Sequence, residues 1–87
     1  MTVPTVRIAL IGMGRMGLAL DALAATRQCE VVARFGTPSA ERPLTGASLS
    51  GAQVALEFTA PSAAVDNMLT CLRAHCPVVV EIGRAHV

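Results

Sequence analysis

Three glycines near the start of the chain have the spacing Gly12-x-Gly14-x-x-Gly17, and the residues between them are Met13, Arg15 and Met16. A turn of this kind, placed between a strand and a helix, typically binds the diphosphate of a dinucleotide. The first glycine permits the tight turn, the second lets the diphosphate approach the backbone, and the third lets the helix pack closely. The free N–H groups at the helix start would bind the anion. The alternative is a purely structural strand-to-helix turn.

Two arginines are candidates for contacts with phosphate groups. Arg15 lies in the glycine-rich turn and would either contact a phosphate or lie in solvent. Sites that require NAD usually place an acid at the end of the second strand, where it binds the ribose 2′-hydroxyl. The expected strand end has no acid, which favours NADPH or the use of both cofactors. Arg34 would then bind the 2′-phosphate; if it points away from the ribose, Thr37 and Arg42 become the candidates.

The hydrophobic pattern predicts strands and helices in alternation. Strands are expected at residues 6–11, 30–35, 53–58 and 77–80, and helices at 14–27 and from about 62 to 75. Residues 36–51 are rich in glycine, proline, serine and threonine and are expected to form a loop, with room for a short extra strand. This order, β-α-β-loop-β-α-β, predicts an α/β fold, a partial Rossmann-type doubly wound parallel sheet with right-handed crossovers.

Apolar residues recur at helical spacing in both predicted helices. They are Met16, Leu20 and Leu23 in the first, with Ala19 and Ala24 on the same side, and Val65, Leu69, Leu72 and Cys76 in the second. Such stripes are typical of helix faces that pack on a core. The long loop would let the third strand cross to the other side of the first strand. Ligands bind at such a topological switch point, so Thr59 would face the glycine-rich turn. Thr59 or Ser62 could also cap the second helix.

Composition excludes several classes of protein. The 87 residues are 53% apolar with a net charge of +1 and no run of like charges, so no footprint for nucleic acid or a membrane surface is expected. No apolar stretch is long enough to span a bilayer, and no signal peptide is recognisable. The odd set of Cys29, Cys71 and Cys76 contains no C-x-x-C pair, which argues against zinc and disulfides and for thiols in a reducing cytoplasm. His75 is expected on the surface at a helix end, not in catalysis.

The last seven residues, EIGRAHV, do not continue the pattern of a buried strand. They can be back-translated as GAG ATC GGA AGA GCA CAC GTC, which contains the start of a widely used sequencing adapter. We therefore expect residues 81–87, including His86, to be a non-native tail and residues 1–80 to be the N-terminal part of a dinucleotide-binding domain. A natural tail that matches by chance is the alternative. The short chain is expected to be marginally stable on its own.

The opening VRIALIGMGRMGLAL is similar to several reductases, including the 3-hydroxyisobutyrate and 6-phosphogluconate dehydrogenases. The later segments AQVALEFTAP, AVDN and PVVV resemble the 4-hydroxy-tetrahydrodipicolinate reductase family. In that family an acid-Phe-Thr-x-Pro segment leads into the second helix, and the next strand enters a Gly-Thr-Thr-Gly segment that would begin here at position 81. Glu57 stands where aspartate is commoner in the family. The resemblance covers most of residues 6–80, although the loop at 36–51 matches poorly.

The resemblance implies an NADPH- or NADH-dependent reductase of a cyclic imine-type dicarboxylate in lysine and diaminopimelate biosynthesis. It implies that the cofactor is bound by the glycine-rich turn, Gly12, Met13, Gly14, Arg15, Met16 and Gly17, and that Phe58 and Thr59 lie beside the nicotinamide. The family's substrate-binding basic residues and His-Lys motif belong to a C-terminal domain that is expected to be absent, so no catalytic residue is assigned. The chain itself is expected to lack reductase activity and to bind cofactor weakly, and only a full-length enzyme is expected to form a homo-oligomer.

Three other interpretations remain open at this point. The first is a fragment of another oxidoreductase with a glycine-rich turn. The second is a non-catalytic nucleotide-sensing domain, and the third is an inert gene fragment with no function of its own. The native continuation of the sequence after position 80 would distinguish them, since a Gly-Thr-Thr-Gly segment there would support the dipicolinate reductase assignment.

Overall fold

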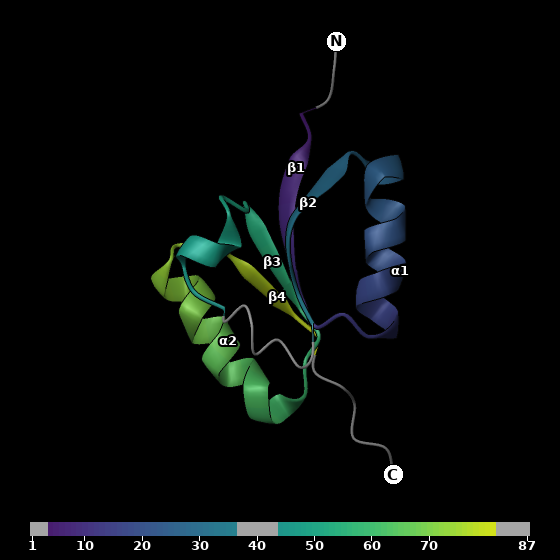
Figure 1. Ribbon diagram of the computed structural model, residues 1–87. Coiled ribbons are helices and arrows are strands. Elements are labelled where there is room, and N and C mark those ends of the chain that lie inside the picture. Colours follow the sequence, from purple (N-terminus) through teal and green to yellow (C-terminus); the bar gives the residue numbers. More distant parts are fainter. Residues whose placement is uncertain (1–3, 37–43, 82–87) are drawn as a thin grey trace.

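The computed structural model describes residues 4–36 and 44–81 (Figure 1). Its elements follow the predicted order: β1 (Val6–Ile11), α1 (Arg15–Ala24), the short 3-10 turn η1 (Ala25–Arg27), β2 (Cys29–Phe35), a second 3-10 turn η2 (Ala47–Leu49), β3 (Val54–Glu57), α2 (Pro61–Arg73) and β4 (Val78–Val80). The predicted α/β class is confirmed. The predictions for Thr37, Arg42 and His86 lie outside the described residues, as does most of the proposed tail.

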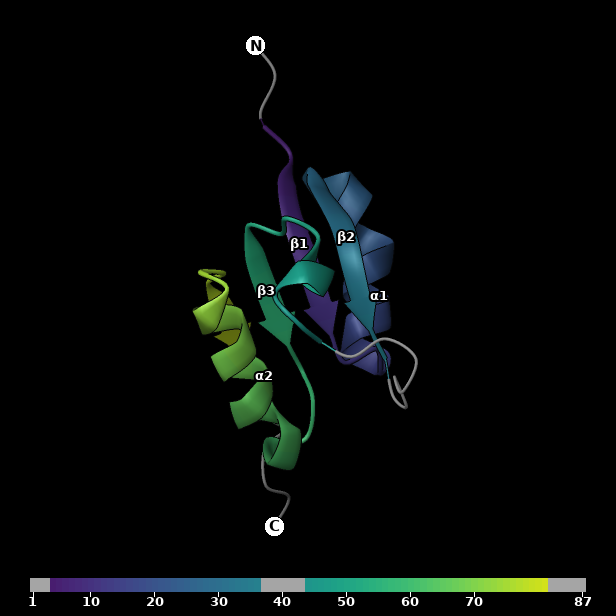
Figure 2. The ribbon, with the colours of Figure 1, turned by 60° about the vertical axis from the view of Figure 1, so that its left-hand side comes forward.

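The four strands form one parallel sheet in the order β2-β1-β3-β4. β1 therefore pairs with β2 on one side and with β3 on the other, as the long loop predicts. Right-handed crossovers that leave β1 in opposite directions place their helices on opposite faces of the sheet. Accordingly α1 and α2 cover opposite faces (Figures 1 and 2). The chain reverses its winding direction between β1 and β3, so the carboxyl ends of these strands form a switch point.

The main core lies between the sheet and α2. Its buried members come from all parts of the chain: Ala9, Ile11, Ala33, Phe35, Leu49, Ala55, Cys71 and Cys76. Leu49 reaches this core from η2. The described part of the segment 36–51 thus contains a 3-10 turn where a short extra strand was considered.

The predicted packing faces of the two helices were only partly right. In α1 the predicted Ala24 is buried together with Gly17, whereas Met16 and Leu23 are 51% and 46% exposed. In α2 the buried residues are Ala64 and Cys71. Of the predicted stripe, Cys76 is buried just beyond the helix, and Val65, Leu69 and Leu72 are exposed. Small side chains allow each helix backbone to approach the sheet closely, so the larger apolar residues are turned outward.

The ends of the helices follow local chemistry. The first helical segment reaches Arg27 through η1, as predicted, and Gln28 then takes a left-handed conformation with φ 59°. Pro61 occupies the start of α2, where its missing N–H costs no hydrogen bond. α2 ends at Arg73, two residues before His75, which is exposed and has φ 58°. Within the described ranges, neither helix is long and apolar enough to cross a membrane.

Candidate functional site

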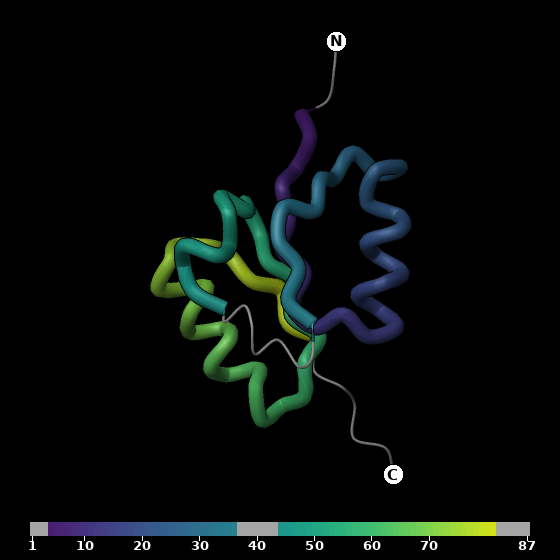
Figure 3. The backbone as a smooth tube through the Cα atoms, viewed as in Figure 1, coloured from purple at the N-terminus to yellow at the C-terminus, as the bar shows by residue number. Residues whose placement is uncertain are grey.

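The chain turns sharply between β1 and α1, at the carboxyl edge of the sheet (Figure 3). Gly12 has φ +100°, a conformation that L side chains rarely adopt, and its N–H donates to the carbonyl oxygen of Phe35 over 2.7 Å. A Cβ on Gly17 would collide with the carbonyl oxygen of Gly12. Gly12 therefore makes the turn, and Gly17 lets α1 begin directly against it.

Gly14 differs from these two glycines because it is open to solvent. It is the N-cap of α1, and a Cβ placed on it would meet nothing within 4 Å. The first hydrogen bond of the helix runs from the N–H of Leu18 to the carbonyl oxygen of Gly14, over 2.9 Å. No described residue accepts a hydrogen bond from the backbone N–H groups of residues 13–17, and no side chain caps the helix. These amides offer hydrogen-bond donors, and the helix dipole adds a partial positive charge, which are the features suited to an anion.

The segment that follows β3 lies directly against the glycine-rich turn. The N–H of Phe58 donates to the carbonyl oxygen of Ile11 over 2.8 Å, which extends the β1–β3 pairing. A Cβ on Gly12 would lie 3.2 Å from the carbonyl carbon of Phe58 and 3.3 Å from the amide nitrogen of Thr59. The structure therefore brings Thr59 beside the turn, as the predicted topology requires.

Glu57, at the end of β3, is completely buried and accepts three hydrogen bonds. Its Oε1 accepts from both the backbone N–H and the hydroxyl of Thr59, each over 2.5 Å, and its Oε2 accepts from Nδ2 of Asn67 over 2.7 Å. The alternative that Thr59 or Ser62 caps α2 is not borne out, because the N-cap is Ala60 and no side chain makes a capping hydrogen bond there. Sequence reasoning missed Glu57 and Asn67; the available signal was an acid inside the apolar strand VALE.

A cavity of about 340 Å³ opens at this edge of the sheet. It is lined by the strand ends of β1 and β2, by Leu44 and by the start of α2: Ile11, Phe35, Gly36, Leu44, Thr59, Ala60, Ala63 and Asn67. Gly36 faces the glycine-rich turn, because a Cβ on it would lie 3.6 Å from Cβ of Met13. None of residues 12–17 lines the cavity, but two of its lining residues, Gly36 and Thr59, lie against Met13 and Gly12 of the turn.

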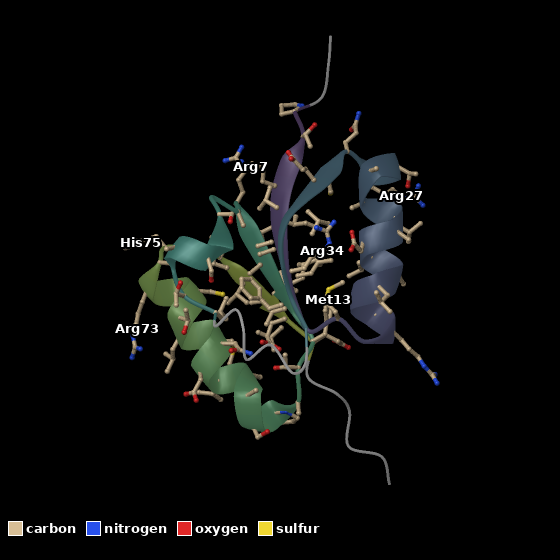
Figure 4. The ribbon with its side chains drawn as sticks, in the orientation of Figure 1. Arg7, Met13, Arg27, Arg34, Arg73 and His75 are labelled. Atoms are coloured by element: carbon tan, nitrogen blue, oxygen red, sulfur yellow. The ribbon has the colours of Figure 1, made fainter. Side chains whose placement is uncertain are left out.

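Arg34 does not line this cavity. Its Nε and Nη2 donate to the two carboxylate oxygens of Asp21 in α1, over 2.6 and 2.8 Å, and Figure 4 shows it between β2 and α1. These hydrogen bonds hold the pKa of Asp21 below its usual value and raise the pKa of Arg34. The other predicted contacts lie at the carboxyl edge of the sheet, whereas Arg34 is engaged on the face that α1 covers.

The two buried thiols, Cys71 and Cys76, are not activated. Burial raises the pKa of Cys71 to about 11, and the proximity of Cys76 and Glu57 adds to the shift. Burial also raises the pKa of Cys76. A nucleophilic cysteine requires a lowered pKa, so both thiols act here as small packing groups.

The parallel sheet, the glycine-rich turn at a helix start and the adjoining switch point define the class of the protein: a Rossmann-type, dinucleotide-binding α/β domain. Residues 6–82 match the family described as "Dihydrodipicolinate reductase, N-terminus", and the chain belongs to this family.

A curated relative supports the same assignment. The chain is 32% identical over 72 residues to the 4-hydroxy-tetrahydrodipicolinate reductase of Christiangramia forsetii. That alignment covers 83% of this chain but only 29% of the relative, so the chain spans less than a third of the relative's length. The resemblance seen in the sequence is confirmed, and the alternative oxidoreductase families and a nucleotide-sensing domain are not favoured.

Proposed function

We propose that this chain supplies the diphosphate-binding part of the NAD(P)H site of a 4-hydroxy-tetrahydrodipicolinate reductase. The observation that carries the proposal is the set of free backbone amides at residues 13–17, with open space above Gly14. A diphosphate placed there would accept hydrogen bonds from these amides and would be stabilised by the dipole of α1. Arg15, at the first position of α1 and exposed, is available to neutralise a phosphate oxygen.

In the complete enzyme, the bound cofactor would supply a hydride to a cyclic imine-type dicarboxylate, in the biosynthesis of lysine and diaminopimelate. The residues of this chain would hold and orient the cofactor. Phe58 and Thr59 would form the wall beside the nicotinamide, because they follow β3 and touch the glycine-rich turn. Residues that bind the dicarboxylate would come from another domain, so the chain alone is proposed to bind cofactor weakly and to have no reductase activity.

NADPH, or both NADPH and NADH, is the proposed cofactor. The end of β2 offers no carboxylate to bind a ribose 2′-hydroxyl or to repel a 2′-phosphate, since Gly36 follows the strand. Arg34 remains a proposed partner of the 2′-phosphate only if it leaves Asp21, and Thr37 and Arg42 are the alternatives. The proposed location is the cytoplasm, and homo-oligomers are proposed for the complete enzyme alone.

The tail at residues 81–87 is proposed to be translated adapter sequence. In the structure Glu81 contributes a backbone N–H to the carbonyl oxygen of Glu57 over 2.9 Å, a bond that any residue except proline can make. The nucleotide sequence tests this proposal: any codon choice other than the adapter's across these positions would refute it.

Gly14→Ala tests the cofactor site directly. The methyl group would meet no protein atom, and Gly14 has φ −81°, so the fold is expected to persist. The same methyl would occupy the space needed by the diphosphate and should weaken NADPH binding by about tenfold or more, in line with the loss of a charge-assisted hydrogen bond. Titration of NADPH into the labelled chain, followed by NMR, measures both affinity and fold. Unchanged affinity in a folded Gly14→Ala variant would contradict the proposal.

A further inference from the structure

The carboxylate of Glu57 determines how the hydrogen-bonding groups of Thr59 are oriented. The backbone N–H of Thr59 and Nδ2 of Asn67 can only donate to it, so Glu57 acts as an acceptor at both of its oxygens. The hydroxyl of Thr59 lies 2.5 Å from Oε1 and 3.4 Å from the carbonyl oxygen of Ala60, so its single proton goes to the much nearer Oε1. The hydroxyl oxygen therefore has only lone pairs left for any other partner.

That oxygen has one long contact with a described donor. Asn67 approaches it with Nδ2 at 3.4 Å, a long contact that involves one lone pair at most. Thr59 is only partly buried and lines the cavity of about 340 Å³ together with Asn67. No described side chain supplies a further donor to Thr59, although its Oγ1 can still accept one.

We infer that Glu57 is a positioning residue of the dinucleotide site, which fixes Thr59 so that its Oγ1 accepts a hydrogen bond from an N–H donor of the bound cofactor. This inference rests on the proposed function. Both ends of NAD(P)H carry such a donor, because the nicotinamide has a carboxamide and the adenine has an exocyclic amine. A ligand group that could only accept would meet the lone pairs of Thr59 and be disfavoured.

The role of Thr59 is tested with Thr59→Val, which keeps the backbone N–H that Glu57 binds and removes the hydroxyl. Binding of NADPH should weaken by about fivefold to tenfold, as expected for one lost hydrogen bond. Thr59→Ser restores the hydroxyl and should recover most of this loss. Thr70→Val removes a hydroxyl from the same region of the chain and serves as the matched control, because that hydroxyl donates to the carbonyl oxygen of Asp66 and does not line the cavity.

Cofactor analogues show which donor Thr59 binds. In 3-acetylpyridine adenine dinucleotide the carboxamide N–H is absent, and in nicotinamide hypoxanthine dinucleotide the adenine amine is absent. If Thr59→Val weakens binding of the parent cofactor but not of the acetylpyridine analogue, the carboxamide is the partner of Thr59. If it weakens binding of the parent cofactor but not of the hypoxanthine analogue, the adenine amine is the partner. Either result supports the inference. Equal weakening of both analogues, or no weakening at all, would overturn it, since a purely structural change would not depend on the analogue.

The role of Glu57 is tested by exchanging the amide and the carboxylate in its contact with Asn67. Asn67→Asp places a second carboxylate against Oε2, and repulsion should displace Glu57 from Thr59 and weaken NADPH binding by about tenfold. Adding Glu57→Gln restores a donor and an acceptor in complementary positions, so the double variant should return to within about threefold of the parent. If Asn67→Asp does not fold, the double variant and Thr59→Val still decide the matter.

The outcomes separate this inference from the proposed function. If the parent chain binds neither NADPH nor NADH, the proposed function fails and the positioning role falls with it. If the parent binds and folded Asn67→Asp binds equally well, only the role of Glu57 is overturned.

Discussion

Gly17→Ala should destabilise the chain, although alanine is the better helix former. In an isolated helix this change would stabilise by about 1 kcal/mol. Here the new methyl group would collide with the carbonyl oxygen of Gly12, and a backbone atom held in a tight turn cannot move aside as a flexible side chain could. Overpacking of this kind costs about 1–3 kcal/mol. Because the collision is severe, we expect a net loss of about 2 kcal/mol, which corresponds to a fall of roughly 10 °C in Tm for a domain of this size.

Urea titration followed by circular dichroism measures this loss as a change in the free energy of unfolding. Gly14→Ala is the matched control, because it makes the same chemical change three positions earlier where the structure leaves open space. The two variants should therefore behave in opposite ways: Gly17→Ala loses stability, and Gly14→Ala keeps the fold but loses cofactor affinity. A Gly17→Ala chain as stable as the parent would refute the close packing of α1 on the turn.

Two further predictions concern cofactor choice and pH. Gly36→Asp places a carboxylate at the end of β2, where there is room for its Cβ beside Met13. It should weaken the binding of NADPH relative to that of NADH by about tenfold, as measured by parallel titrations. Equal effects on the binding of both cofactors would contradict the assignment of this position to the ribose. The pKa of Cys71 is raised to about 11 in the folded chain, from about 9 for a thiol in the unfolded chain. The buried, protonated thiol therefore contributes its full stabilisation at pH values below about 9, and this stabilisation should fall as the pH rises from about 9 to 11. Urea titrations across that range should show the fall, and Cys71→Ala should reduce it; a flat profile in the parent would contradict the prediction.

The order of elements was predictable because each strand is a short apolar run bounded by glycine, proline or polar residues. The glycine spacing predicted where β1 ends and α1 begins, and the long segment after β2 predicted that β3 would lie on the other side of β1. These features are local in sequence or follow from the handedness of crossovers, so no tertiary information was needed.

The packing faces and part of the site could not be predicted in this way. Glycine, alanine and cysteine form the buried sides of both helices, whereas hydrophobic patterns give most weight to large residues such as Leu72. The sequence left two directions open for Arg34, because alternation along β2 does not say which face of the strand lies toward the ribose. In the structure Ala33 and Phe35 are in the core, and Arg34 between them binds Asp21 of α1. The buried carboxylate of Glu57 is tolerated in the core because Thr59 and Asn67, which come later in the chain, donate hydrogen bonds to it.

The contact between Gly12 and the start of the segment after β3 has a mechanical consequence. The atoms nearest to a Cβ on Gly12 are two main-chain atoms of Phe58 and Thr59 and the methyl group of Thr59. The separation between the glycine-rich turn and the segment after β3 is therefore set mainly by the backbone and by the β1–β3 pairing. Substitutions elsewhere on the helices can thus change the stability of the fold without changing this separation.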